Sequence, residues 1–195
     1  MCSSDLPVGW AYRNRIAFVR SEARDVVTAR QLTYLSRIEH PAGRAFVFGQ
    51  YDLLRDRLAG IASRHSATVG LQWKALGDAK GVRTFQLFSG AGAAREHRVT
   101  PAGAHVAHID TALVNAGWAY LRKFVNGSEF RDDLRTDVAL DRRNDWRLSH
   151  TAIMTATVNS RLSLKLQHVL RYVNDPPPTY RRTDTVASAG VTVRF

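Results

Sequence analysis

Apolar and polar residues alternate along most of this chain, so the repeat is two residues rather than the 3.6 of a helix. In residues 161–173 the even positions include Leu162, Leu164 and Leu166, whereas the odd positions are mostly polar. On a helix these leucines would lie on different sides, whereas on a strand they form one apolar face. This segment is therefore predicted to be a β-strand.

The same alternation recurs often enough to predict about ten strands. It is clearest in residues 60–75, 127–140, 146–158, 161–173 and 187–195, and less regular in residues 10–20, 25–38, 44–54, 82–96 and 105–122. Turn-forming residues separate these segments, for example in residues 40–43 and 174–178. No segment has convincing helical periodicity, and no linker or repeat divides the chain. We therefore predict an all-β, antiparallel up-and-down barrel as a single domain over residues 10–195, after a non-native or disordered start at residues 1–9.

The length of the strands bears on where such a barrel would reside. Several run 13 residues or more, whereas strands of soluble proteins usually have roughly 5–6 and a membrane crossing takes about 9–11. A transmembrane barrel has apolar side chains outside and polar ones inside, and a soluble barrel reverses these faces. Periodicity alone leaves both arrangements open.

Three groups of residues favour the transmembrane barrel. Charges of both signs alternate on one face and would form an interior ladder, consisting of Arg131, Asp133, Arg135 and Asp137. Aromatic residues near strand ends are typical of the girdles at the two membrane surfaces, and these are Trp73, Trp118, Tyr120, Trp146 and Tyr172. The last strand matches the insertion signal of bacterial outer-membrane barrels, with Ser188, Gly190, Val193 and the terminal Phe195. The alternative is that Phe195 caps the core of a soluble protein.

Composition adds an expectation about partners and about the start of the chain. Of 195 residues, 28 are Lys or Arg and 17 are Asp or Glu, and the resulting charge of +11 suits an anionic partner such as nucleic acid, phospholipid or lipopolysaccharide. The single cysteine, Cys2, excludes a disulfide framework. Residues 1–6 lack the features of a secretory signal, and "CSSDL" is what a common sequencing adapter encodes. We therefore expect the native N-terminus, with its signal peptide, to be missing.

Two stretches resemble a known bacterial family. "RLSLKLQHVLRYVNDPPPTYRRTDTVASAGVTVRF", residues 161–195, and "FVFGQYDLLRDRLAGIASRHSATVGLQWKAL", residues 46–76, are similar to the domain-of-unknown-function family 481, also called the salt-induced outer-membrane protein group. The likeness spans most of residues 45–195 and fades toward the N-terminus. It implies an outer-membrane β-barrel with no catalytic residues to carry over. The chain departs from the family in being basic and in lacking the signal and first strands, so the intact barrel would have ten to twelve strands.

The position of Phe195 orients the predicted barrel. With Phe195 at the periplasmic side, the opposite, outer rim would carry arginines, namely Arg95, Arg98, Arg142, Arg143, Arg181 and Arg182. Guanidinium groups suit phosphates, so Arg142, Arg143, Arg181 and Arg182 are predicted to bind lipopolysaccharide, with an ordinary solvated loop edge as the alternative. The outer connections are short and none is typical of a plug, whereas ionic side chains would largely fill a barrel this narrow.

No catalytic, metal or cofactor site is predicted. Ser149 and His150 are adjacent and would point to opposite faces of a strand, so they cannot form a catalytic pair. Gly90 and Gly92 indicate a strand bend or close packing rather than a phosphate-binding loop. Asp132 and His168 fall on the lipid-facing side, where charge is costly, so either they lie near an interface or a bulge shifts the register.

Together these patterns predict a structural or stress-response protein of the bacterial outer membrane. It would be a monomer and not a wide porin, with at most narrow passage of small solutes. Its partners would be outer-membrane lipid, lipopolysaccharide and, through the C-terminal strand, the barrel-assembly machinery, but not nucleic acid. The alternatives are an outer-membrane lipid hydrolase and a soluble basic barrel that binds an anionic ligand.

Overall fold

Ten long strands make up nearly all the regular structure in this computed structural model. The structure describes residues 9–23, 26–56, 59–77, 82–99, 107–142, 144–159, 161–177 and 180–193. The strands are β1 Ala11–Ala23, β2 Val26–Ala42, β3 Ala45–Asp56, β4 Ile61–Gly77, β5 Arg83–Arg98, β6 Ala107–Lys123, β7 Glu129–Ala139, β8 Trp146–Thr157, β9 Leu162–Val173 and β10 Thr183–Val193. The predicted start at residues 1–9 lies outside the described residues, apart from Gly9.

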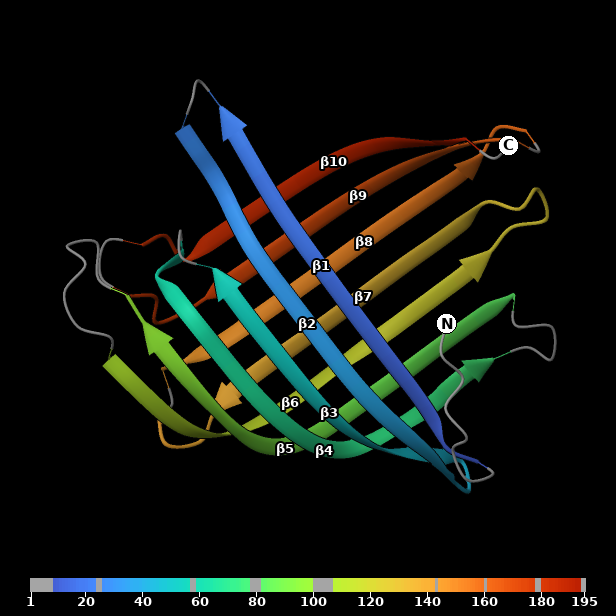
Figure 1. Ribbon diagram of the computed structural model, residues 1–195. Helices are drawn as coiled ribbons and strands as arrows, with labels where there is room; N and C mark the ends of the chain where they lie inside the picture. The colour runs from blue at the N-terminus through green and yellow to red at the C-terminus, as the bar shows by residue number, and fades with distance from the viewer. Residues whose placement is uncertain are drawn as a thin grey trace.

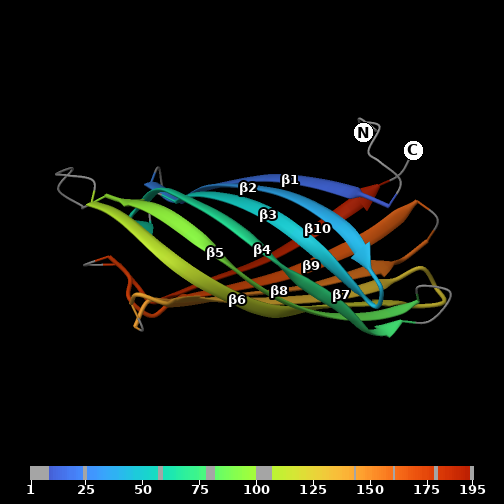
Figure 2. The ribbon, with the colours of Figure 1, turned by 90° about the horizontal axis from the view of Figure 1, so that it is seen from below.

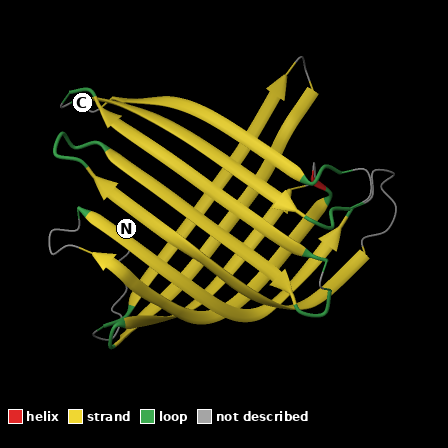
Figure 3. Cartoon of the chain, turned by 180° about the vertical axis from the view of Figure 1, so that it is seen from behind, coloured by secondary structure: helices red, strands yellow, loops and turns green. Residues whose placement is uncertain are grey.

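Each strand pairs antiparallel with the next, so the order in the single sheet is β1 to β10. The sheet is strongly curved. In Figure 1, β1 and β2 pass across β7–β10, and Figure 3 shows the same crossing from behind. Figure 2 shows the two layers edge-on, with β4–β6 running between them. The predicted all-β, up-and-down sheet of ten strands is confirmed. Its closure into a barrel stays a prediction, because β1 and β10 are not paired within the described residues.

The two faces of the sheet differ in chemistry. Ion pairs join strands that are not neighbours, such as Arg135 of β7 with Asp52 of β3, so the charged side chains point into the space that the curved sheet encloses. We call this side the inner face. The opposite, outer face exposes apolar side chains, among them Val69, Leu164 and Leu166. The two largest fully buried side chains, Phe48 and Leu113, lie on the inner face.

Glycines on the inner face allow the middle strands to bend. Gly70 of β4 lies directly opposite Gly90 of β5, and Gly92 lies opposite Thr68. A Cβ atom at Gly92 would collide with the carbonyl oxygen of Ala67, so only glycine permits this approach. The predicted strand bend or close packing at Gly90 and Gly92 is confirmed.

Two predicted boundaries are wrong. Residues 40–42 were expected in a turn, but β2 continues through Pro41, which pairs with Phe46, to the tight turn at Gly43. Proline is tolerated there because it removes only one donor at the end of a hairpin. β10 begins at Thr183 and not at 187, because the polar start of this strand does not show the apolar alternation.

The strands are staggered: from β10 to β4, each paired residue lies closer to one end of its own strand. Ala187 lies near the middle of β10, and the residues that follow it from strand to strand are His168, Ala152, Asp132, Tyr120, Phe85 and Leu76. Leu76 is the last residue but one of β4. Such a stagger is what strands tilted around a barrel require.

No helix in the described ranges is long and apolar enough to cross a membrane.

Candidate functional site

The sheet has two ends, which we name by their connections. The C-terminal end contains the end of β10 and the turns β2–β3, β4–β5, β6–β7 and β8–β9. The loop end contains the connections β1–β2, β3–β4, β5–β6, β7–β8 and β9–β10. Most of the buried charge of the described residues gathers inside the loop end.

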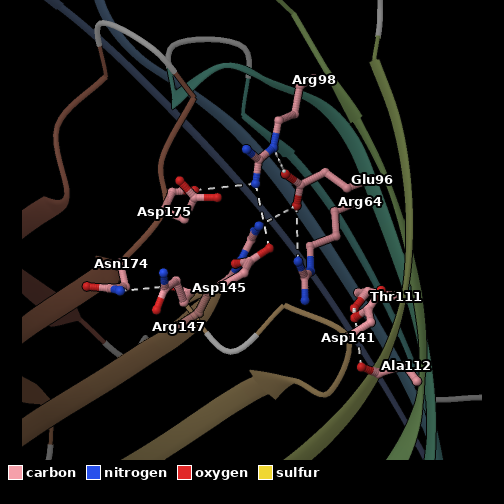
Figure 4. Close-up of polar contacts among 11 residues, drawn as sticks. Arg64, Glu96, Arg98, Thr111, Ala112, Asp141, Asp145, Arg147, Asn174 and Asp175 are labelled. Carbon is pink, nitrogen blue, oxygen red and sulfur yellow. Dashed lines mark hydrogen bonds and ion pairs between the residues drawn. The ribbon is translucent and has the colours of Figure 1, made fainter.

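Glu96 is the centre of this ion cluster, which also contains Arg64, Arg98, Asp145 and Arg147 (Figure 4). The Glu96 carboxylate accepts hydrogen bonds from Arg64 at 3.0 Å and Arg98 at 2.7 Å, and Arg147 lies 2.7 Å away. Asp145 lies 3.4 Å from Arg147 and 3.6 Å from Arg98. The cluster therefore joins β4, β5, β8 and the β7–β8 connection.

The cluster is largely buried and carries more positive than negative charge. Side-chain exposure is 3% for Glu96, 4% for Asp145 and 13% for Arg98. Burial alone would raise the pKa of Glu96, but the charges of Arg147 and Arg64 and the bond from Arg98 outweigh it and lower the pKa to about 2. Because three guanidinium groups face two carboxylates, loss of either carboxylate would leave buried positive charge uncompensated.

A cavity below the cluster has room for about one water molecule. Its volume is about 10 Å³, and Arg64, Thr111, Asp137, Asp145 and Arg147 contribute to its walls. A site of this size with several polar partners suits a single bound water. This cavity is too small to let a solute pass.

The described residues of the β9–β10 connection, 174–177 and 180–182, contact other connections at the loop end, beside the cluster. Arg98 donates to the carbonyl oxygen of Asp175 at 3.4 Å, and the Asn174 amide donates to the carbonyl oxygen of Asn144 at 2.8 Å. Tyr180 packs so closely on Gly60, in the β3–β4 connection, that a Cβ atom there would overlap the tyrosine ring. These contacts between connections that are far apart in the sequence were not visible in the alternation pattern, and the expectation that no outer connection acts as a plug stays a prediction.

The predicted ladder residues all lie on the inner face of β7. Arg135 bridges Asp137 at 2.8 Å and Asp52, across the enclosed space, at 2.9 Å. Arg131 pairs instead with Glu129 at 3.2 Å. Asp133 lies on the same face and is partly buried.

The predicted arginine rim is only partly a rim. Arg142, Arg181 and Arg182 are exposed at the loop end, and Arg143 lies outside the described residues. Arg98, which was expected there, is buried in the ion cluster. Arg95 is exposed on the outer face. Its Nε and Nη2 atoms donate to the two carboxylate oxygens of Asp110 at 2.6 and 2.9 Å.

The five predicted girdle residues all lie on the outer face, at two levels. Trp73, Trp118 and Tyr120 are near the C-terminal end of the sheet. Trp146 and Tyr172 are at the loop end, where their ring centroids are 4.7 Å apart. Their role as a membrane girdle stays a prediction.

The predicted insertion signal lies on the edge strand β10. Ser188 and Gly190 share the inner face with Gln167 and Lys165, and Val193 lies on the outer face. Phe195 is outside the described residues. Every described residue of β10 is exposed, so this strand has little cover on either face.

Sequence reasoning missed several arrangements, and two of them matter for the candidate sites. Nothing in the alternation marked Asp145, in a connection, as a partner of Arg98 and Arg147. On the outer face, Asp132 accepts a hydrogen bond from the Trp118 indole at 2.8 Å and lies 2.7 Å from His150. The sequence signal for this second group was an acid on the apolar side of a strand. β7 pairs with β6 and β8 without a register shift, so no bulge in β7 accounts for the position of Asp132.

The arrangement offers little for catalysis or metal binding. Ser149 faces inward beside Arg135 and Arg171, away from His150, as expected from adjacent strand residues. Within the described residues, no group of three or more His, Cys, Asp or Glu side chains is placed to hold a metal ion. The loop-end cluster is instead suited to holding strands and connections together.

Comparison with known proteins identifies the family. Residues 7–195 match the family described as "Protein of unknown function, DUF481". No curated protein and no solved structure matches the chain. The match covers nearly the whole sequence and confirms the resemblance seen in residues 46–76 and 161–195. The chain therefore belongs to the DUF481 family.

Proposed function

We propose that this protein is a structural outer-membrane β-barrel whose interior is closed by ion pairs, and not a diffusion pore. The observation that carries the proposal is the contrast between a charged inner face, bridged across by Arg135–Asp52 and Arg147–Glu96, and an outer face of exposed apolar residues. A soluble barrel would have the reverse arrangement.

The outer face supports contact with acyl chains. Ile16, Val69, Leu166 and Val191 are between 48% and 73% exposed, which is costly in water when many such residues share one surface. Aromatic residues at both ends of the strands fit the two membrane surfaces. The exposed arginines at the loop end, Arg142, Arg181 and Arg182, would then meet lipopolysaccharide phosphates, and β10 would be the strand presented to the barrel-assembly machinery.

The inner face supports a closed interior. The loop-end cluster and the β9–β10 connection occupy one end, and Arg135, Phe48 and Leu113 fill the space between the layers. Passage of solutes would require these groups to separate. We therefore expect the purified protein to behave as a membrane-embedded barrel with little or no ion conductance.

Closure of the sheet can be tested directly. β1 and β10 run antiparallel, so a barrel forms if their free edges pair. Phe18→Cys with Ala187→Cys, both on the outer face and introduced on a Cys2→Ser background, should form a disulfide in a closed barrel, with Ile16→Cys tested in place of Phe18→Cys for the neighbouring register. Val69→Cys with Ala187→Cys is the control that should remain reduced.

Cell fractionation and conductance test the proposal as a whole. We expect the full-length protein in the outer-membrane fraction, with heat-modifiable gel migration, and planar bilayers containing it to lack large channel steps. Recovery in a soluble fraction would refute the membrane barrel. Large, frequent conductance steps would refute the closed interior.

The hydrolase alternative receives less support. His150 and Asp132 form a pair on the outer face, but Ser149 points inward, and the pair has no serine directly opposite it in β7 or β9. We propose no enzymatic role.

A further inference from the structure

A carboxylate on the outer face lies among aromatic rings. Tyr120 of β6 lies directly opposite Asp132, Phe130 is two residues away on the same face, and Trp118 donates to the carboxylate at 2.8 Å. The Tyr120 and Phe130 ring centroids are 6.2 Å apart. Aromatic faces and a carboxylate together attract an alkylammonium group, because both present negative potential.

Asp132 keeps capacity for a further partner. One oxygen accepts from Trp118 and the other contacts His150, but an ionised carboxylate has about four acceptor positions. The side chain is 21% exposed, so it can be reached from the outer face. This distinguishes it from Glu96, which is surrounded by three arginines.

An apolar groove begins beside this carboxylate. Its volume is about 500 Å³, and its walls include Phe130, Ala152, Met154, Leu166, His168 and Ala187. Ala152 lies directly opposite Asp132, so the groove and the carboxylate share a border. Small alanine side chains on β8 and β10, flanked by larger ones, make the depression.

The direction of the groove fits a lipid molecule. Asp132 is the fourth residue of β7 from the C-terminal end of the sheet, whereas His168 and Ala187 lie near the middle of β9 and β10. A polar headgroup at Asp132 would therefore be near one surface of the membrane, and an acyl chain in the groove would run toward the middle.

We propose that the outer face of β6–β10 binds one phospholipid with a primary amine headgroup. The ammonium group would bind the Asp132 carboxylate among Trp118, Tyr120 and Phe130, and one acyl chain would occupy the groove over Ala152. This inference rests on the membrane barrel proposed above. A phosphatidylethanolamine molecule has the required chemistry, whereas phosphatidylglycerol lacks the ammonium group.

Native mass spectrometry of the full-length protein in detergent tests the site. On addition of phosphatidylethanolamine or phosphatidylglycerol at equal concentration, we expect one bound phosphatidylethanolamine per protein and at least about fivefold less phosphatidylglycerol adduct. Asp132→Asn, which keeps the shape of the side chain, should remove this preference. Asp110→Asn, at the other end of the outer face, is the matched control and should keep it.

A second variant separates binding from folding. Ala152→Phe fills the groove without changing charge, and should lower retention of the lipid while heat-modifiable migration shows that the protein is folded. Equal binding of the two lipids by the unchanged protein, or undiminished preference in Asp132→Asn, would overturn the inference and leave the barrel intact. A protein recovered outside the membrane fraction would overturn the proposed function instead.

Discussion

Glu96 and Asp132 are both acids in places that disfavour a free charge, but their surroundings differ. Glu96 lies inside the loop end, 3% exposed, with three arginines around it. Asp132 lies on the outer face, 21% exposed, with an indole and an imidazole. The first carboxylate is fully used by the protein, whereas the second can still accept a ligand. The burial of Glu96 therefore serves structure, because its partners saturate it, whereas the free acceptor positions of Asp132 fit the lipid headgroup proposed above.

The largest expected effect is from removing the central charge of the cluster. Glu96→Gln leaves Asp145 as the remaining carboxylate of the cluster beside its three arginines, and we expect the free energy of unfolding to fall by about 3–5 kcal/mol. Urea unfolding in detergent micelles measures this. Glu129→Gln removes the acid of a more exposed pair and should cost less than about 1 kcal/mol. Equal losses in the two variants would contradict the comparison.

Acid should weaken the same cluster. Because the pKa of Glu96 is lowered to about 2 in the folded protein, its contribution to stability is fully present above its ordinary pKa and is lost as the pH falls through about 2. The loss should be roughly 3 kcal/mol and absent from Glu96→Gln. Unfolding measured between pH 5 and pH 2 checks this, and an identical pH dependence in both proteins would rule it out.

The bend of the inner face should tolerate less change than the edge strand. Gly92→Ala places a Cβ atom against the Ala67 carbonyl, and we expect a loss of about 1–3 kcal/mol. Gly190→Ala has no atom within 4 Å to meet and should change stability by less than about 0.5 kcal/mol. The same urea measurement compares them, and the reverse order would show that the bend relaxes easily.

The smallest effect on stability is expected at the outer-face carboxylate. Asp132→Asn keeps the acceptor for Trp118 and removes only a partly exposed pair with His150, so the free energy of unfolding should change by less than about 1 kcal/mol. A loss as large as that of Glu96→Gln would mean that Asp132 serves structure in the same way. The temperature at which gel migration changes from the folded to the unfolded position measures this difference.

Much of the fold was predictable from the alternation because it reports a local property. Side chains of a strand point to opposite faces in turn, so Leu162, Leu164 and Leu166 already indicated a strand and a shared face. The place of Arg135 on a polar face and of Trp118 on an apolar face followed in the same way, whereas the alternation left open which face points inward. The start of β10 at Thr183 was missed, because a polar strand beginning has no apolar residues to alternate.

The candidate sites depended on contacts that alternation does not encode. Arg98 has the pattern of an exposed strand-end arginine, and only the approach of Asp145 and Asp175 from distant connections buries it. Asp132 was visible as an acid on the apolar side, but its neighbours Trp118 and His150 come from the strands on either side.

The sequence by itself determined the family, the ten strands and the two faces, because these depend on residue type and on a repeat of two. Only the tertiary structure decided which charges meet across the enclosed space, which connections contact one another at the loop end and where a groove remains open. Those features depend on the curvature and stagger of the sheet, which bring together residues such as Asp52 and Arg135 that are far apart in the chain.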